Sequence, residues 1–164
     1  MNCNECNLVE ANKASGLCDQ CEQIEMTKIN DVLYLPALGL IISLLVIPWE
    51  LYHFTQVIFS YLKHGSFLNS YLIGAMGCLL LNFLITLYAS WRFFMRKKGI
   101  RKVMITYYIF SLLASLYFTV VPTMLYGIQL KFTDLGNVIS GILGVVIWIP
   151  YFLLSNRINV VFTK

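Results

Sequence analysis

The sequence predicts an all-α membrane protein with four transmembrane helices and a small, cysteine-rich N-terminal head. Of its 164 residues, 59% are hydrophobic and 12% are charged, whereas soluble globular domains average about 45–50% apolar and 25% charged residues. Long uncharged runs alternate with short charged segments, and four of the five cysteines lie within the first 21 residues. We therefore expect a head over residues 1–30 and a membrane domain over residues 31–164.

The head contains two CxxC pairs, Cys3 with Cys6 and Cys18 with Cys21, separated by eleven residues. Two such pairs bring four thiolates into a tetrahedron, for which Zn²⁺ is the usual occupant. Roughly thirty residues cannot bury enough apolar surface to fold alone, so the metal would supply folding free energy, of order 10–16 kcal/mol in small zinc peptides. We predict a structural Zn²⁺ in a zinc-ribbon-like head, with iron in the same site or redox-active cysteines as alternatives.

The first membrane span is expected over residues 32–50. Val32 to Trp49 are eighteen residues without a charge, which is near the lower limit for a helix that crosses a bilayer. Pro48 should kink or stop this helix near its far end. Ala37, Gly39 and Ser43 are small residues that suit close helix packing.

The next segment, residues 53–64, is amphipathic. Its apolar residues recur at helical spacing, with polar residues on the other side. The segment either lies as a separate helix in the outer interface, which we favour, or extends the first helix past Pro48. The sequence leaves both arrangements open.

Three further spans are expected over residues 69–91, 103–127 and 136–155. The uncharged runs that contain the second and third are twenty-seven and twenty-eight residues long, enough to cross a bilayer with some tilt. Pro122 is expected to kink the third span. The fourth contains Gly136, Gly141 and Gly144, which would allow another helix to approach closely.

A basic hinge separates the second and third spans and indicates the topology. It holds six of the twelve Lys and Arg residues, namely Arg92, Arg96, Lys97, Lys98, Arg101 and Lys102. Cytoplasmic loops carry an excess of Lys and Arg. A cytoplasmic hinge places both termini in the cytoplasm, with ten basic residues inside and two, Lys63 and Lys131, outside. The hinge could also bind anionic lipid headgroups, at about 1 kcal/mol per basic residue.

Three polar residues within the membrane domain form a candidate site: Glu50, His53 and Asn82. Glu50 and His53 lie one helical turn apart and could share a proton. An ionisable residue at membrane depth suggests function, but Glu50 follows a short span and Pro48, which favours an ordinary charge at a helix end. Asn82 is expected to join two helices by a hydrogen bond. Cys78, alone in the second span, is expected to behave as a small apolar residue.

The last span and its flank, Val145 to Ile158, resemble the closing signature of a family of small four-helix bacterial inner-membrane proteins of unknown function. Ala37 to Ile42 and the basic hinge share the resemblance, which covers roughly residues 32–162. It implies a multi-pass protein of the cell inner membrane with no assigned activity. The cysteine head is an addition that only some members resemble.

The sequence contains no phosphate-binding loop, no Ser/His/Asp set and no paired carboxylates, so we expect no enzyme. Its net charge of +4 reflects topology and gives no evidence for nucleic acid.

The leading hypothesis is a docking or accessory subunit, whose zinc-stabilised head meets a membrane or cytoplasmic partner or a second copy of the chain. The alternative hypothesis is a transport or lipid-handling protein. The small number of polar groups in the membrane domain counts against it, because they offer no obvious aqueous path. A thiol-dependent oxidoreductase comes third, since cysteines in the reducing cytoplasm rarely keep disulfides.

Overall fold

The computed structural model describes residues 2–6, 8–12, 15–27, 31–64, 69–127, 129, 132–155 and 157–163. Their elements are α1 (Asp19–Thr27), a short 3₁₀ turn η1 (Asp31–Leu33), α2 (Tyr34–Lys63), α3 (Ser70–Phe94), α4 (Ile100–Tyr126), α5 (Phe132–Leu154) and α6 (Arg157–Val161). The described part of the chain has no strand. Within α2, α3, α4 and α5 lie four stretches long and apolar enough to cross a membrane, which confirms the predicted all-α fold with four spans.

The first span is longer than expected, because α2 runs without interruption from Tyr34 to Lys63 and includes Pro48. Residues 53–63 therefore extend the first helix, His64 caps its end, and the expected separate helix over residues 53–64 does not form. A proline inside a helix costs about 3 kcal/mol. Ending the helix in an apolar environment would instead leave several backbone N–H and C=O groups unpaired, at several kcal/mol each. The second cost exceeds the first, so the helix continues.

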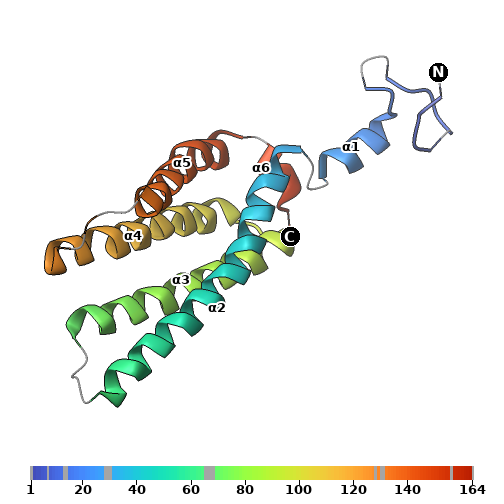
Figure 1. Cartoon of the computed structure of the whole chain (residues 1–164). Coiled ribbons are helices and arrows are strands. Elements are labelled where there is room, and N and C mark those ends of the chain that lie inside the picture. The colour runs from blue at the N-terminus through green and yellow to red at the C-terminus, as the bar shows by residue number, and fades with distance from the viewer. Residues whose placement is uncertain are drawn as a thin grey trace.

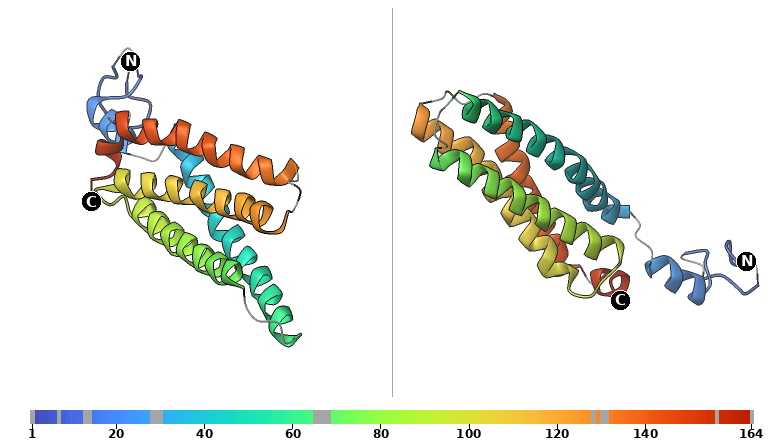
Figure 2. Two further views of the ribbon diagram at one scale, coloured as in Figure 1. Left: turned by 90° about the vertical axis from the view of Figure 1, so that its left-hand side faces the viewer. Right: turned by 90° about the horizontal axis from the view of Figure 1, so that it is seen from below.

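The four long helices form two hairpins that meet at one end of the molecule. Helix α3 packs against both α2 and α4, and α5 packs against α4. Figure 1 shows that the α2–α3 and α4–α5 hairpins diverge away from the end where α6 lies. The start of α2, the α3–α4 hinge, the end of α5, the head and the C-terminus all lie toward this end, as the two views of Figure 2 also show. We call it the hinge end.

The buried apolar core is concentrated at the hinge end. It consists of Leu33, Ala37, Leu40, Ala89, Phe93, Ile100, Met104, Tyr107, Phe152, Ile158, Val161 and Phe162. Most of these residues come from the first turns of α2 and α4, the last turns of α3 and α5, and helix α6. Along the rest of the four helices, many large apolar side chains point outward, as expected for surfaces that contact lipid.

The helices approach one another closely at some of the small residues but not at all of them. A Cβ added at Gly141 would lie 3.1 Å from Leu112 on α4, as expected for a helix contact. Among the described residues, no atom lies within 4 Å of a Cβ added at Gly39 or Gly136, so no described helix uses the space beside them. Among the described glycines, the closest approach is at Gly74 on α3, where a Cβ would lie 2.5 Å from the Tyr117 hydroxyl. Side chain size at position 74 therefore limits how closely α3 and α4 can pack.

Candidate metal centre and membrane cavity

The four predicted ligand cysteines lie together in the head. The sulfur atoms of Cys3, Cys6, Cys18 and Cys21 are all within 4.8 Å of one another, and those of Cys6 and Cys18 are 3.7 Å apart. In a tetrahedral site with zinc–sulfur bonds of about 2.3 Å, neighbouring sulfurs are about 3.8 Å apart. The cluster therefore has the size of a four-thiolate metal site, and its residues could hold a metal ion.

Backbone hydrogen bonds hold the two cysteine pairs in place. The Cys3 N–H donates to the Val9 carbonyl at 2.9 Å, and one antiparallel bridge joins Asn2 to Glu10. The Cys18 carbonyl accepts from the Glu22 N–H at 2.8 Å, in the first turn of α1. The first pair thus lies in a tight loop and the second at a helix start. The described head has no strand; Cys18 directly precedes α1 and Cys21 lies in its first turn.

The sulfur atoms have different affinities for protons. Backbone N–H groups of Cys6, Cys18 and Glu5 lower the pKa of the Cys3 thiol to about 6, because they stabilise its thiolate. The hydrogen bond with Cys18, burial and the other nearby sulfurs raise the pKa of Cys21 to about 12. One thiolate therefore forms readily, and full ionisation of the cluster requires a cation among the sulfurs.

Two of the six basic hinge residues tie the hinge end together. The Arg92 guanidinium lies over the Tyr88 ring, with its carbon 5.8 Å from the ring centroid, and donates to the Lys98 carbonyl. Arg101 donates to the Ser155 carbonyl at 2.9 Å, which links the start of α4 to the end of α5. These two side chains thus have structural partners within the chain.

The other four basic residues of the hinge lie in its turn or just after it. Arg96 has a backbone φ of +53° and forms an interaction within the structure. Lys97 is half-buried, whereas Lys98 and Lys102 are exposed. Among the six, Lys98 and Lys102 are therefore the most accessible to a lipid headgroup.

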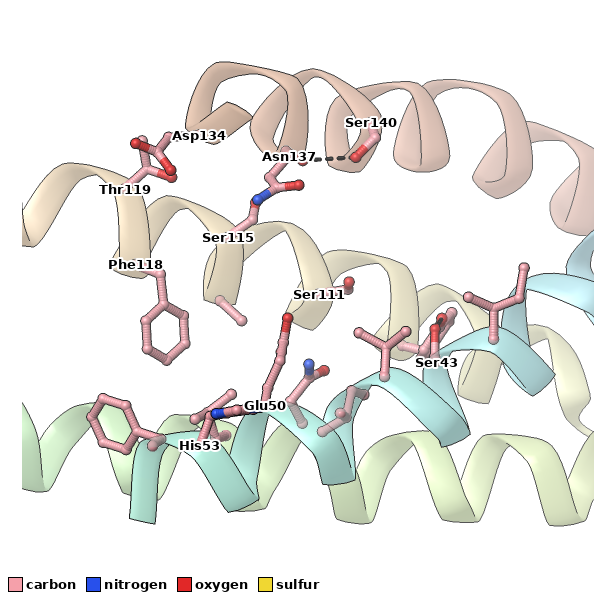
Figure 3. Close-up of a pocket in the computed structure, with 18 of the residues that line it drawn as sticks. Ser43, Glu50, His53, Ser111, Ser115, Phe118, Thr119, Asp134, Asn137 and Ser140 are labelled. Atoms are coloured by element: carbon pink, nitrogen blue, oxygen red, sulfur yellow. Dashed lines mark hydrogen bonds between the residues drawn. The ribbon is translucent and has the colours of Figure 1, made fainter. Parts of the chain in front are cut away.

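A cavity of about 800 Å³ lies among the four long helices. Its polar lining comes from all four, namely Ser43, Glu50 and His53 of α2, Asn82 of α3, Tyr107, Ser111, Ser115 and Thr119 of α4, and Asp134, Asn137 and Ser140 of α5. Figure 3 shows Glu50 extending from α2 toward Ser111, the Asn137 side chain extending toward Ser115, and Asp134 beside Thr119. The structure thus brings all three residues of the predicted polar site, Glu50, His53 and Asn82, to one cavity.

Glu50 is not at a helix end, contrary to the expectation from its neighbour Pro48. Because α2 continues to Lys63, Glu50 lies about 24 Å along the helix axis from Tyr34 and about 20 Å from Lys63, at 1.5 Å per residue. It is therefore near the middle of a long helix and lines the cavity. An ionisable residue near the middle of a helix long enough to cross a membrane is a candidate for function.

Asn82 also differs from what the sequence predicts. Its amide oxygen is buried and has no hydrogen-bond partner in the described part of the chain. Side-chain hydrogen bonds between the described helices include that of the Ser43 and Tyr107 hydroxyls, 2.8 Å apart, between α2 and α4. Asn82 therefore lines the cavity with part of its side chain, while its amide oxygen is buried among protein atoms.

Sequence reasoning missed the polar residues of α4 and α5. The signal was present as spacing inside the apolar runs. Ser111, Ser115 and Thr119 recur every four residues, and Asp134, Asn137 and Ser140 recur every three, so each set lies along one side of its helix. Polar stripes of this kind identify the side of a membrane helix that faces a cavity.

The helices and the cluster together define a multi-pass helical membrane protein with an N-terminal cysteine site that could bind a metal. Residues 26–163 match the model of a family described as a protein of unknown function, DUF2569. The chain therefore belongs to this family, as the resemblance of its last span and hinge indicated. No curated protein and no solved structure matches the chain.

Proposed function

We propose that this chain is a non-catalytic membrane protein that binds a small solute or a lipid headgroup in its cavity, in the class of transport or lipid-handling proteins. The observation that supports this proposal is the 800 Å³ cavity, which is lined by polar and ionisable residues from four membrane-spanning helices. Ligand sites in proteins usually have volumes of about 300–1,000 Å³. Ionisable residues inside a membrane domain are costly and mark substrate or ion pathways.

The position of the polar groups also supports a transport role, against which their small number had counted. The polar residues are few, but they are gathered on the inner sides of α2, α4 and α5 (Figure 3). The core at the hinge end holds the hairpins together, while the hairpins diverge beyond it (Figure 1).

A docking role for the head is the second candidate, and one observation favours it. Leu8, Val9 and Ile24 are 86%, 58% and 55% exposed, and they lie in the head close in sequence to the cysteines. Exposed apolar side chains on a small rigid unit suit contact with a partner protein. We propose a structural Zn²⁺ for this head, because Zn²⁺ is the usual occupant of a closed four-thiolate site.

The proposed location is the cell inner membrane, with the head, hinge and C-terminus in the cytoplasm. The support is the excess of Lys and Arg in the hinge. The hinge and both described ends of the chain lie at the same end of the structure (Figure 2). A cytoplasmic location also keeps the cysteines reduced and available to a metal.

Native mass spectrometry of the full chain purified in detergent tests the cavity function. We expect a bound small molecule on the unaltered protein and its loss from Ser111→Phe, because the larger ring would occupy the cavity. Leu113→Phe is the matched control, since Leu113 is on the same helix but 56% exposed on the outer surface. Circular dichroism and gel filtration verify that both variants fold. The absence of any adduct, or equal adducts on all three proteins, would contradict the proposal.

A further inference from the structure

We infer that the cavity is one half of a larger site, and that a second copy of the chain completes it by meeting its open side between α2 and α5. This inference rests on the proposed function and adds the partner that closes the site toward the bilayer. It is supported by three observations: the position of the open side, the matching depths of the polar groups on α2 and α5, and free space beside α2.

The open side of the cavity lies between its two outer helices. The extensive contacts among the long helices join α2 to α3, α3 to α4 and α4 to α5, so α2 and α5 are the ends of a row. The described lining residues of α3 and α4 are buried or half-buried, whereas Glu50 and His53 of α2 are exposed, as are Asn137 and Ser140 of α5. The cavity is therefore a groove with α3 and α4 as its floor.

In a membrane, the open side of this groove faces the acyl chains of the bilayer. Figure 3 shows Glu50 and His53 on α2 across the groove from Asn137 and Ser140 on α5. Polar and ionisable side chains are costly where they face acyl chains, which offer no hydrogen bonds. A second protein surface with polar groups at the same depth removes this cost.

The polar groups of the two outer helices lie at matching depths. Helix α2 begins and α5 ends at the hinge end (Figure 1). Glu50 lies about 24 Å along α2 from Tyr34, at 1.5 Å per residue. Measured from Leu154, Asn137 and Ser140 lie about 26 and 21 Å along α5. Glu50 is therefore level with the two polar residues of α5.

The symmetry of a membrane dimer brings these groups together. Two copies inserted with the same topology are related by a two-fold axis along the membrane normal, and each contact in such an interface is made twice. Rotation about an axis in front of the open side places α2 of one copy against α5 of the other, at unchanged depth. Glu50 then meets Asn137 and Ser140 of the second copy, whose amide N–H and hydroxyl can donate to its carboxylate.

The charges of the groove agree with this pairing. Its described lining contains Glu50, His53 and Asp134 and no Lys or Arg, and Asp134 already has an interaction within the chain. His53 lies about 28 Å along α2 from its start, between the depths of Asn137 and Asp134 on the facing α5. Its ring N–H can donate to either residue of the second copy. The two Glu50 side chains are on different edges, so the carboxylates do not face each other, which would be costly.

Space for the second copy is present beside α2. Gly39 is on the same side of α2 as Ile42, Val46, Glu50 and His53, because these positions recur every three or four residues. No described atom lies within 4 Å of a Cβ added at Gly39. Small residues on a membrane helix allow another helix to approach closely. Helix α5 of the second copy would fill the space that a single chain leaves open.

Association of the full chain is measured by energy transfer between donor-labelled and acceptor-labelled copies, in liposomes of neutral lipid at rising lipid-to-protein ratios. We expect the transfer to follow a monomer–dimer equilibrium. Gly39→Leu should raise the dissociation constant at least about tenfold, because its side chain occupies the space for the second copy. Gly77→Leu is the matched control and should change it less than about twofold, since a Cβ at Gly77 also has nothing within 4 Å but lies on α3.

A disulfide crosslink tests how the two copies meet. Ile42 lies about 12 Å along α2 from the hinge end, and Ile147, seven residues after Ser140 on α5, lies about 10 Å along its helix. In a Cys78→Ser background, Ile42→Cys combined with Ile147→Cys should give a covalent dimer on mild oxidation. Ile41→Cys combined with Ile147→Cys is the control, because Ile41 is exposed on another side of α2. The Cys78→Ser chain alone measures any crosslinking through the head cysteines.

Chains that stay monomeric, equal effects of the two leucines, or equal crosslinking by the two cysteine pairs would overturn the inference. The adduct in native mass spectrometry tests the proposed function separately. Monomeric chains that carry an adduct removed by Ser111→Phe would reject the dimer and support the proposed function, with lipid or water at the open side. A dimer without any adduct would support the pairing of the copies and contradict the proposed function.

Discussion

The hydroxyls of Ser43 and Tyr107 are 2.8 Å apart and join α2 to α4. Tyr107 belongs to the buried core at the hinge end, and both residues line the cavity. Their bond therefore lies at the boundary between the packed and open parts of the bundle. It fixes the distance between α2 and α4 where the two hairpins begin to diverge.

We expect this bond to contribute a measurable coupling between α2 and α4. In a double-mutant cycle with Ser43→Ala and Tyr107→Phe, the coupling free energy should be about 0.6 kcal/mol and at most about 1.7 kcal/mol, the range for such bonds in membranes. Unfolding in a denaturing detergent measures it. Tyr107→Phe combined with Ser140→Ala is the control and should be additive, because Ser140 bonds to its own helix at Asn137. Equal coupling free energies in the two cycles would contradict a specific hydrogen bond between Ser43 and Tyr107.

Two glycines of α3 should respond differently to the same substitution. Gly74→Ala brings a methyl group to 2.5 Å from the Tyr117 hydroxyl, while Gly77 has nothing within 4 Å. The Tyr117 ring is stacked on Tyr71 at 14°, so it cannot move away without losing that contact. We expect Gly77→Ala to raise the free energy of unfolding by up to about 1 kcal/mol, because alanine favours the helix. We expect Gly74→Ala to lower it. Equal shifts of the melting temperature in the two variants would show that α3 and α4 do not meet as described.

Much of the fold could be predicted, because membrane spans depend on long apolar runs and on where charges are excluded. The four spans and the hinge follow from those runs alone. The end of the first helix could not be placed from Pro48, since a proline inside a membrane helix costs less than breaking the helix there. Gly74 was missed because close approach depends on which residue of α4, here Tyr117, lies opposite.

The cysteine cluster should hold one Zn²⁺ per chain in the purified protein. Cys18→Ser should lose most of it, because a site with three thiolates must take water or a weaker donor. Cys78→Ser is the matched control, since Cys78 lies on α3 and outside the cluster. Elemental analysis by mass spectrometry measures the metal. Iron in the site, or a metal-free head with two reversible disulfides, would refute the structural-zinc prediction.

The proposed topology predicts which positions face outward in cells. In a Cys78→Ser background, Lys63→Cys should react with a membrane-impermeant thiol reagent added to intact cells, and Lys98→Cys should not. The reason is the excess of basic residues in the hinge, and Lys63 ends α2 at the opposite end of the bundle from that hinge (Figure 1). Labelling both variants after membrane permeabilisation is the control. Reaction of Lys98→Cys with the reagent outside intact cells would show that the hinge faces outward, which is the reverse of the proposed topology.

The candidate site could be predicted only in part. The cysteine spacing is local, and it is enough to bring four sulfurs together. Glu50, His53 and Asn82 stood out as polar residues in apolar runs, but their meeting with Ser111 and Asn137 depends on how the hairpins diverge. The largest buried cluster lies at the hinge end, and no single run of residues encodes that arrangement.

We propose that water reaches the polar cavity on the inner side of the bundle, and the most direct test is thiol reactivity along α4. Ser111 lines the cavity, whereas Leu113 is exposed on the outer surface toward lipid. Thiols react as thiolates, which form readily only where water reaches them. In nanodiscs, with the Cys78→Ser background, a small water-soluble thiol reagent should modify Ser111→Cys at least about tenfold faster than Leu113→Cys. Equal rates, or faster modification at position 113, would contradict the account.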